Sequence, residues 1–207
     1  GVDAVAFWQV LDAAKAADPK IPQRVVLPLE AGFETDSLAV ISETDILGDR
    51  IGCFLFQLPP SYRYAKTRLN DIVSQLDPAR RNVVEFRHVS WWNEEVYSAF
   101  RKAGIIFCSC SGPRLPDELV RTADEVYVRL HGPKRWYRHD YSKEELAIWA
   151  NRIKASGATR AWVYFNNDND AHAPRNATTL RRMLARSLRA VKPAVGTLPI
   201  SQTFSEV

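Results

Sequence analysis

Short apolar runs alternate with amphipathic stretches along most of the chain, at a spacing of about 25 to 35 residues. The apolar runs predict strands over residues 53–58, 83–88, 105–110, 125–131 and 161–167, and a further strand, weakened by Pro28, over residues 24–30. Apolar positions three or four residues apart predict helices over residues 2–17, 37–47, 66–76, 93–103, 142–155 and 176–190. Because the strands are almost continuously apolar and alternate with helices, the pattern indicates βα units and a parallel sheet.

Residues that favour helix ends support two of these helices. Asn93 is a residue type whose side chain caps the first turn of a helix, and Gly104 suits the left-handed conformation that ends one. Ser142 is followed three residues later by Glu145, which is the spacing of a capping box. We therefore expect one helix to begin at each of Asn93 and Ser142.

Size and composition indicate an ordinary globular protein. The chain has 207 residues, of which 46% are apolar and 25% are charged, and we expect a single domain over residues 1–207. Its three cysteines, Cys53, Cys108 and Cys110, do not make a disulfide framework, so we expect buried, reduced thiols. No apolar run approaches the ~20 residues that cross a membrane, and the first residues show no signal peptide. These features predict a cytoplasmic protein without a membrane partner.

Polar side chains gather at the carboxyl ends of the predicted strands. In parallel α/β folds, ligands bind at these ends, so five successive strands that finish in polar residues predict a site there. The residues are, in chain order, Gln57, Glu85, Arg87, His88, Ser109, Arg129, His131, Asn166, Asn167 and Asp168.

Alternation along the strands sorts these polar residues by face. Glu85 and Arg87 share one face of their strand, and Arg129 and His131 share a face with Tyr127. If the sheet closes into a barrel, these four polar side chains point into its mouth. Two arginines and a histidine favour an anion such as a phosphate or a carboxylate, and Glu85 is a candidate general acid or base.

Several of these residues also have simpler interpretations. Glu85 with Arg87 or Arg129 is also the pattern of a structural ion pair inside a barrel, and His131 before Gly132 is also the pattern of a capped turn. Residues 166–170 are equally typical of a turn rich in Asx hydrogen bonds. Trp91 and Trp92 are more typical of a core or a lid than of a platform for nucleic-acid bases.

The charged groups do not single out a cofactor or a metal. The 28 basic and 24 acidic residues leave a net charge of +4, which suits an anionic ligand but falls short of a dedicated nucleic-acid module. Glu85, His88, His131 and Asp168 are of the right types to hold one metal ion, but the histidines are few and we predict no metal site. The sequence assigns no cofactor.

Five segments carry recognisable motifs, and their order along the chain is also informative. They are residues 54–61 (FLFQLPPS), 84–91 (VEFRHVSW), 127–132 (YVRLHG), 164–168 (YFNND) and 173–177 (APRNA). Together they resemble the motifs of a widespread, mainly bacterial family catalogued as domain of unknown function 72. The resemblance covers a core of residues 47–190, and residues 191–207 form a C-terminal tail.

The resemblance implies a TIM-type (β/α) barrel and a site made of the motif residues. These residues are Gln57, Glu85, Arg87, Arg129, His131, Asn166 and Asn167. The family usually opens with a strand that bears a Gly-Thr-Ser-Gly-Trp-type motif, followed by a strand with an acidic residue, and neither is visible in this sequence. We therefore expect a barrel that is incomplete at its N-terminal end.

Our leading hypothesis is a hydrolase- or isomerase-like enzyme that acts on an anionic, phosphorylated or carbohydrate-like ligand at the mouth of the barrel. In it Glu85 and His131 move protons, Arg87 and Arg129 hold the anion, and Gln57, Asn166 and Asn167 contribute polar contacts. One alternative is a nucleic-acid-binding or nuclease-like protein, which would use Trp91, Trp92 and the basic helix after Asn176. The other is a barrel that binds a ligand without catalysis.

Overall fold

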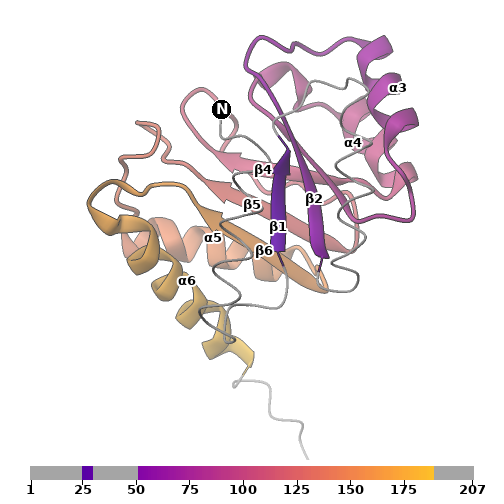
Figure 1. The fold of residues 1–207 in the computed structure, drawn as a ribbon. Helices are drawn as coiled ribbons and strands as arrows, with labels where there is room; N and C mark the ends of the chain where they lie inside the picture. The colour runs from indigo at the N-terminus through magenta and orange to yellow at the C-terminus, as the bar shows by residue number, and fades with distance from the viewer. Residues whose placement is uncertain (1–24, 30–50, 189–207) are drawn as a thin grey trace, which may run out of the picture.

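A single parallel sheet organises the protein. The computed structural model describes residues 25–29 and 51–188. Its six strands lie side by side in chain order, and every neighbouring pair is parallel (Figure 1). They are β1 (Val25–Leu29), β2 (Ile51–Leu58), β3 (Asn82–Phe86), β4 (Ile106–Ser111), β5 (Glu125–Leu130) and β6 (Arg160–Phe165). The predicted strands and their parallel arrangement are confirmed, including the strand that contains Pro28, which lies at an edge of the described sheet, where a proline is tolerated.

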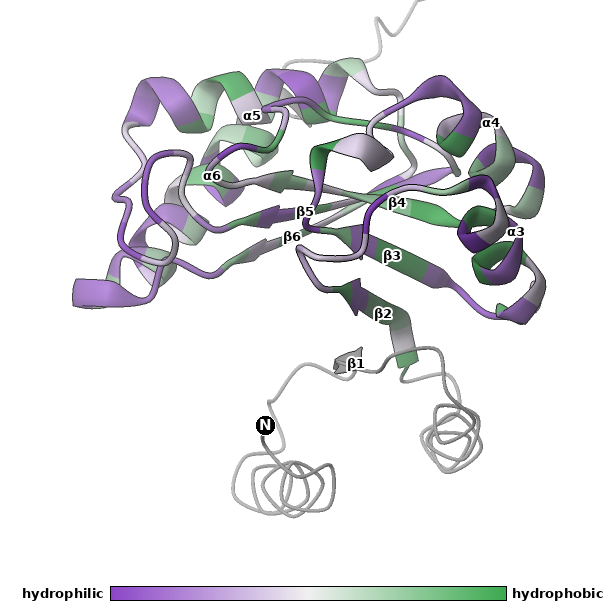
Figure 2. Ribbon diagram, turned by 90° about the horizontal axis from the view of Figure 1, so that it is seen from above, coloured by the Kyte–Doolittle hydropathy of each residue, from purple (hydrophilic) through white to green (hydrophobic). Residues whose placement is uncertain are grey.

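In the described part of the chain, three α-helices connect strands, a fourth follows β6, and the four cover the outer face of the sheet (Figures 1 and 2). They are α3 (Lys66–Gln75), α4 (Glu94–Ala103), α5 (Lys143–Ala155) and α6 (His172–Leu188), with short 3-10 turns η2 (Val89–Trp91) and η3 (Asn169–Ala171). One outer core packs β2, β3 and β4 against α3 and α4, and another packs β5 against α5 and α6. Of the helices in the described part of the chain, none combines the length and the apolar character needed to cross a membrane.

The inner face of the curled sheet carries a third core without any residue from these helices. It consists of Cys53, Leu55, Val83, Ile106, Cys108, Cys110 and Tyr127, with Trp92, Leu115, Ala123, Trp162 and Tyr164 against them. The described part of the protein is therefore a half-barrel, with helices outside and an apolar lining inside (Figure 2). Within the described ranges β1 and β6 are the two edges of the sheet, so these strands alone do not close a barrel.

Both predicted helix starts are confirmed. The Asn93 side chain accepts a hydrogen bond from the backbone N–H of Val96, and α4 ends at Gly104, whose φ of 67° lies in the left-handed region. Ser142 and Glu145 form the reciprocal bonds of a capping box at the start of α5.

Some predicted boundaries were wrong by a few residues. Helix α6 begins at His172 rather than Asn176, because Pro174 lies in the first turn, where a proline loses no hydrogen bond. Strands β3 and β6 end at Phe86 and Phe165, so Arg87 and Asn166 directly follow the strands, whereas Glu85 lies inside β3. The predicted helices over 2–17 and 37–47 and the tail over 191–207 lie outside the described residues.

We expect the substitution Asn93→Ala to lower the free energy of unfolding by about 1 kcal/mol, because the first turn of α4 then loses its side-chain cap. Ser98→Ala, in the middle of the same helix, is the matched control and should change it by less than about 0.5 kcal/mol. Urea unfolding followed by circular dichroism measures both, and equal midpoints for Asn93→Ala and the parent protein would contradict the assigned cap.

Candidate functional site

Glu85 lies at the centre of a buried group of charged side chains on the inner face of the sheet. Its side chain is 0% exposed, and its Oε2 accepts a hydrogen bond of 2.6 Å from Nη1 of Arg129. Its Oε1 forms an ion pair with Nε of Arg87 and lies 3.3 Å from Nε2 of His131. Strand β4 separates β3 from β5, so Arg129 reaches Glu85 across an intervening strand. The four side chains therefore converge, as the alternation of faces along the strands predicted.

Two amide side chains complete the group. Oε1 of Gln57, at the end of β2, accepts hydrogen bonds from Nη2 of Arg87 (2.9 Å) and from Nη1 of Arg129 (2.8 Å). Oδ1 of Asn166, directly after β6, accepts a bond of 3.2 Å from Nε of Arg129. We call the resulting set the mouth cluster. Its members are Gln57, Glu85, Arg87, Arg129, His131 and Asn166.

Asn167 makes its hydrogen bonds away from the mouth cluster. Its Nδ2 donates to the backbone oxygen of His139 and to Oδ1 of Asn176, each at 2.7 Å, and its side chain is buried. Asn176 in turn donates to the carboxylate of Asp140. Asn167 and Asn176 therefore hold the end of β6 to α6 and to the preceding loop. Asn167 thus has a structural role in this arrangement.

The residues considered for a metal ion are only partly brought together. His88 faces Ser90, with 2.8 Å between Nδ1 and the hydroxyl oxygen, and Asp168 is exposed at the start of η3. Among the described residues, the group whose ligand atoms converge is instead Glu85, Cys110 and His131. The signal that could have pointed to Cys110 is its spacing of two residues from Cys108, which puts both thiols on the same face of β4.

The charges around Glu85 keep it ionised. Burial alone would raise the pKa of Glu85, but the hydrogen bond toward His131 and the charges of Arg129 and Arg87 outweigh it and lower the pKa to about 2. Burial lowers the pKa of His131 from 6.5, against the opposing effect of Glu85, so this imidazole is neutral at pH 7. Two guanidinium groups then face one carboxylate, and the mouth cluster carries one positive charge in excess.

The backbone of His131 forms part of a turn, and its side chain belongs to the mouth cluster. Its backbone N–H donates to the oxygen of Ser111 (2.9 Å) and its backbone oxygen accepts from Tyr137 (2.7 Å), so the main chain does form the turn that the sequence suggested. Its side chain is 0% exposed, Nε2 faces Oε1 of Glu85 at 3.3 Å, and Nδ1 has no hydrogen-bond partner in the described structure. A buried imidazole nitrogen without a hydrogen-bond partner is rare in stable cores.

An aromatic residue that the sequence did not single out covers one side of the cluster. The ring of Trp136 lies 4.8 Å from the guanidinium carbon of Arg87 and 5.4 Å from the ring of His131. A Cβ atom at Gly112 would lie 2.6 Å from the Trp136 ring, so glycine is needed for this close approach. Trp136 therefore belongs to the wall of the site.

Trp91 belongs to the core. It is 0% exposed, stacks on Phe86 with ring centroids 4.1 Å apart, and donates through Nε1 to the backbone oxygen of Tyr62 (2.7 Å). Trp91 therefore presents no ring to a nucleic-acid base.

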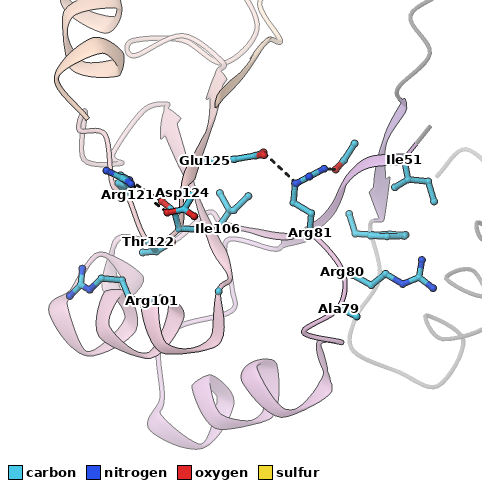
Figure 3. A pocket seen from close by; sticks show the side chains of 14 residues that line it. Ile51, Ala79, Arg80, Arg81, Arg101, Ile106, Arg121, Thr122, Asp124 and Glu125 are labelled. Atoms are coloured by element: carbon cyan, nitrogen blue, oxygen red, sulfur yellow. Dashed lines mark hydrogen bonds and ion pairs between the residues drawn. The ribbon is translucent and has the colours of Figure 1, made fainter. Parts of the chain in front are cut away.

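A large cavity lies at the opposite, amino-terminal ends of the strands (Figure 3). Its volume is about 1220 Å³, and its lining includes four arginines. All four form ion pairs: Arg81 lies 3.4 Å from Glu125 and Arg121 lies 3.6 Å from Asp124 (Figure 3). Arg80 lies 3.6 Å from Asp77, and Arg101 pairs with Glu94. Since ligands of parallel α/β folds bind at the carboxyl ends of the strands, we assign the candidate site to the mouth cluster despite the size of this cavity.

We expect Glu85→Gln to lower the free energy of unfolding by about 3 kcal/mol or more, because the amide leaves two buried guanidinium groups without a counter-charge. The control is Asp117→Asn, which removes an exposed ion pair of 3.1 Å to Arg152 and should cost less than about 1 kcal/mol. Chemical denaturation measures both. Equal, small losses in the two variants would show that the cluster around Glu85 is not tightly coupled.

Comparison with known proteins agrees with the fold. A family model described as "Protein of unknown function DUF72" matches residues 17–200. The chain is similar to a DUF72 family protein from Thermotoga maritima, with a TM-score of 0.72 and 22% identity over 89% of this chain and 81% of that one. It is also similar to a DUF72 family protein from Enterococcus faecalis, with a TM-score of 0.61 and 18% identity over 72% of this chain and 63% of that one. No curated protein matches the chain. A family match over most of the sequence, together with these shared folds, shows that the chain belongs to the DUF72 family.

Proposed function

We propose that the protein is an enzyme that binds a small anionic ligand at the mouth cluster, with Arg87 and Arg129 as the anion-binding residues. The observation that carries the proposal is the excess positive charge held among buried groups. Both guanidinium side chains are largely buried, at 8% and 12% exposure, and they share a single carboxylate. Electrostatic attraction is strongest where water is excluded, so an anion placed beside the two arginines would balance their charge.

Gln57 indicates where an oxygen atom of the ligand would bind. Its amide oxygen accepts a hydrogen bond from each of the two arginines. A phosphate or carboxylate oxygen offers the same acceptor with a negative charge, and charged acceptors form stronger bonds to guanidinium groups than neutral ones. A ligand oxygen that displaced the Gln57 side chain would therefore take over both of its hydrogen bonds to the arginines.

Glu85 and His131 form the reactive pair in this proposal. Glu85 is held as a carboxylate beside Nε2 of His131, which favours the tautomer with the proton on Nε2. The lone pair of Nδ1 is then free to act on the ligand, as a base does in hydrolysis or isomerisation. Glu85 orients His131 rather than exchanging protons itself, and Asn166 holds Arg129 in place.

We also propose that the half-barrel is part of a TIM-type barrel that forms one domain over residues 1–207. Six parallel strands in chain order, with helices outside and an apolar lining inside, support this arrangement. In such a barrel the mouth cluster lies at the carboxyl ends of the strands, which is where these folds carry their active sites.

Inorganic phosphate titrated into the protein by calorimetry tests the anion site. We expect Arg129→Gln to weaken phosphate binding at least about tenfold, since a charge-assisted contact is lost. Arg121→Gln, which alters an arginine of the opposite cavity, is the control and should bind phosphate like the parent protein. Equal affinities in Arg129→Gln and the parent, with unchanged circular dichroism, would overturn the proposal. Tight DNA binding that falls steeply with salt, without phosphate binding, would favour a nucleic-acid function instead.

A further inference from the structure

We propose that Glu85, Cys110 and His131 bind one divalent metal ion of the zinc class at the mouth cluster. The inference rests on the proposed anion site and deepens it, because it assigns a metal to the same centre. The three side chains come from β3, from β4 and from the end of β5, which are neighbours in the sheet.

The positions of the three ligand atoms carry the first argument. A carboxylate oxygen of Glu85, Sγ of Cys110 and a ring nitrogen of His131 all lie within 4.8 Å of one another, and all three residues are buried. Around tetrahedral zinc, ligand atoms at about 2.0 to 2.3 Å from the metal are about 3.3 to 3.8 Å apart. Shifts of about 1 Å, within the reach of side-chain rotation, bring the three atoms to these distances.

The ring nitrogens of His131 are an independent observation. In the part of the chain that the structure describes, Nδ1 is buried without a hydrogen-bond partner, and Nε2 has only Oε1 of Glu85 beside it, at 3.3 Å. Leaving buried polar atoms unpaired costs free energy, and native structures rarely tolerate it. A metal ion bound by one ring nitrogen would satisfy that atom, and the turn would be unaffected because it is formed by the backbone of His131.

The thiols select the class of metal. Sγ of Cys108 lies 3.8 Å from Sγ of Cys110 and 3.9 Å from Oε2 of Glu85, so a second sulfur atom flanks the proposed position. Sulfur and imidazole ligands favour zinc over magnesium or calcium, which prefer oxygen. We assign Cys110 as the ligand, since it is the thiol that converges with both Glu85 and His131, and Cys108 as its neighbour.

Metal binding makes the mouth cluster more positive, so we expect it to be coupled to binding of the anionic ligand, which balances the added charge. Binding M²⁺ to the thiolate of Cys110 releases one proton, so the net charge of the cluster rises by one. Each oxygen of Glu85 has two acceptor positions, so the carboxylate can keep its contacts with Arg87 and Arg129 and still bind the metal. The added positive charge would strengthen the attraction for the anionic ligand.

Three protein ligands leave one position of a tetrahedral centre for water or for an oxygen atom of the ligand. When the metal is bound, His131 gives its lone pair to the metal, and this water becomes the group that accepts or donates protons. Zinc lowers the pKa of its bound water to about 7, so the site would remain reactive at neutral pH.

The test is metal titration of the whole chain after treatment with a chelator. Zn²⁺ competed against a chromophoric indicator should bind with a stoichiometry of one, and Co²⁺ should give the thiolate charge-transfer absorption of a cysteine-ligated site. Cys110→Ser should abolish that absorption and weaken Zn²⁺ binding at least about a hundredfold. Cys53→Ser, which changes the third buried cysteine of the inner face, is the matched control and should behave like the parent protein.

The Co²⁺ spectrum of the parent protein keeps the test decisive if Cys110→Ser does not fold. Absence of a thiolate band, or equal Zn²⁺ affinity in folded Cys110→Ser and the parent, overturns the inference. Phosphate binding by the metal-free protein separates the two proposals. If phosphate binds and the metal does not, only the metal site fails. If Arg129→Gln loses phosphate but keeps Zn²⁺ bound, both sites stand as assigned.

Discussion

A carboxylate removed from water is stable only where positive charge and hydrogen bonds replace its lost hydration, and Glu85 imposes this requirement on the inner face of the sheet. Arg87 meets it from the segment after β3, and Arg129 meets it from β5, two strands away. Beyond Ile106, the strand between them presents the small thiols of Cys108 and Cys110 on this face, which leaves room for the Arg129 side chain to cross. The ion cluster thus fixes the relative positions of three strands at their carboxyl ends.

The apolar lining of the half-barrel strengthens the interactions among these charges. The inner core of β2 to β5 lies along the same face as the mouth cluster, with the stacked rings of Tyr127 and Tyr164 5.1 Å apart. Low polarity around charged groups strengthens their interactions and raises the cost of any group left unpaired. A buried ion cluster gives little more stability than apolar residues of equal volume, and this is one reason for the proposed role in binding.

The excess of positive charge is our reason for proposing a binding site rather than a structural plug. A plug would be expected to pair every charge, as the exposed Arg152–Asp117 pair does on the surface. In the mouth cluster two arginines share Glu85, and their remaining hydrogen bonds go to the neutral oxygens of Gln57 and Asn166. Neutral acceptors leave the excess charge in place, and this charge is what a phosphate or carboxylate would recognise.

The sequence by itself determined the order of strands and helices, the helix caps at Asn93 and Ser142, and the face on which Glu85 and Arg129 lie. These features depend on periodicity and on local hydrogen bonds, and both are determined by residues close together in the sequence. It also placed Asn167 beside Asn166 without distinguishing them, although one contacts Arg129 and the other joins β6 to α6.

Only the tertiary structure decided which distant side chains meet. It brought Cys110 and His131 to Glu85, turned Trp136 onto Arg87, and left Nδ1 of His131 without a hydrogen-bond partner. Such contacts depend on the curl of the sheet, on the path of the loop after β5 and on the close approach that Gly112 allows. Alternation gives the face of a strand to which a side chain points, but the distance across that face is set by the packing of all the strands together.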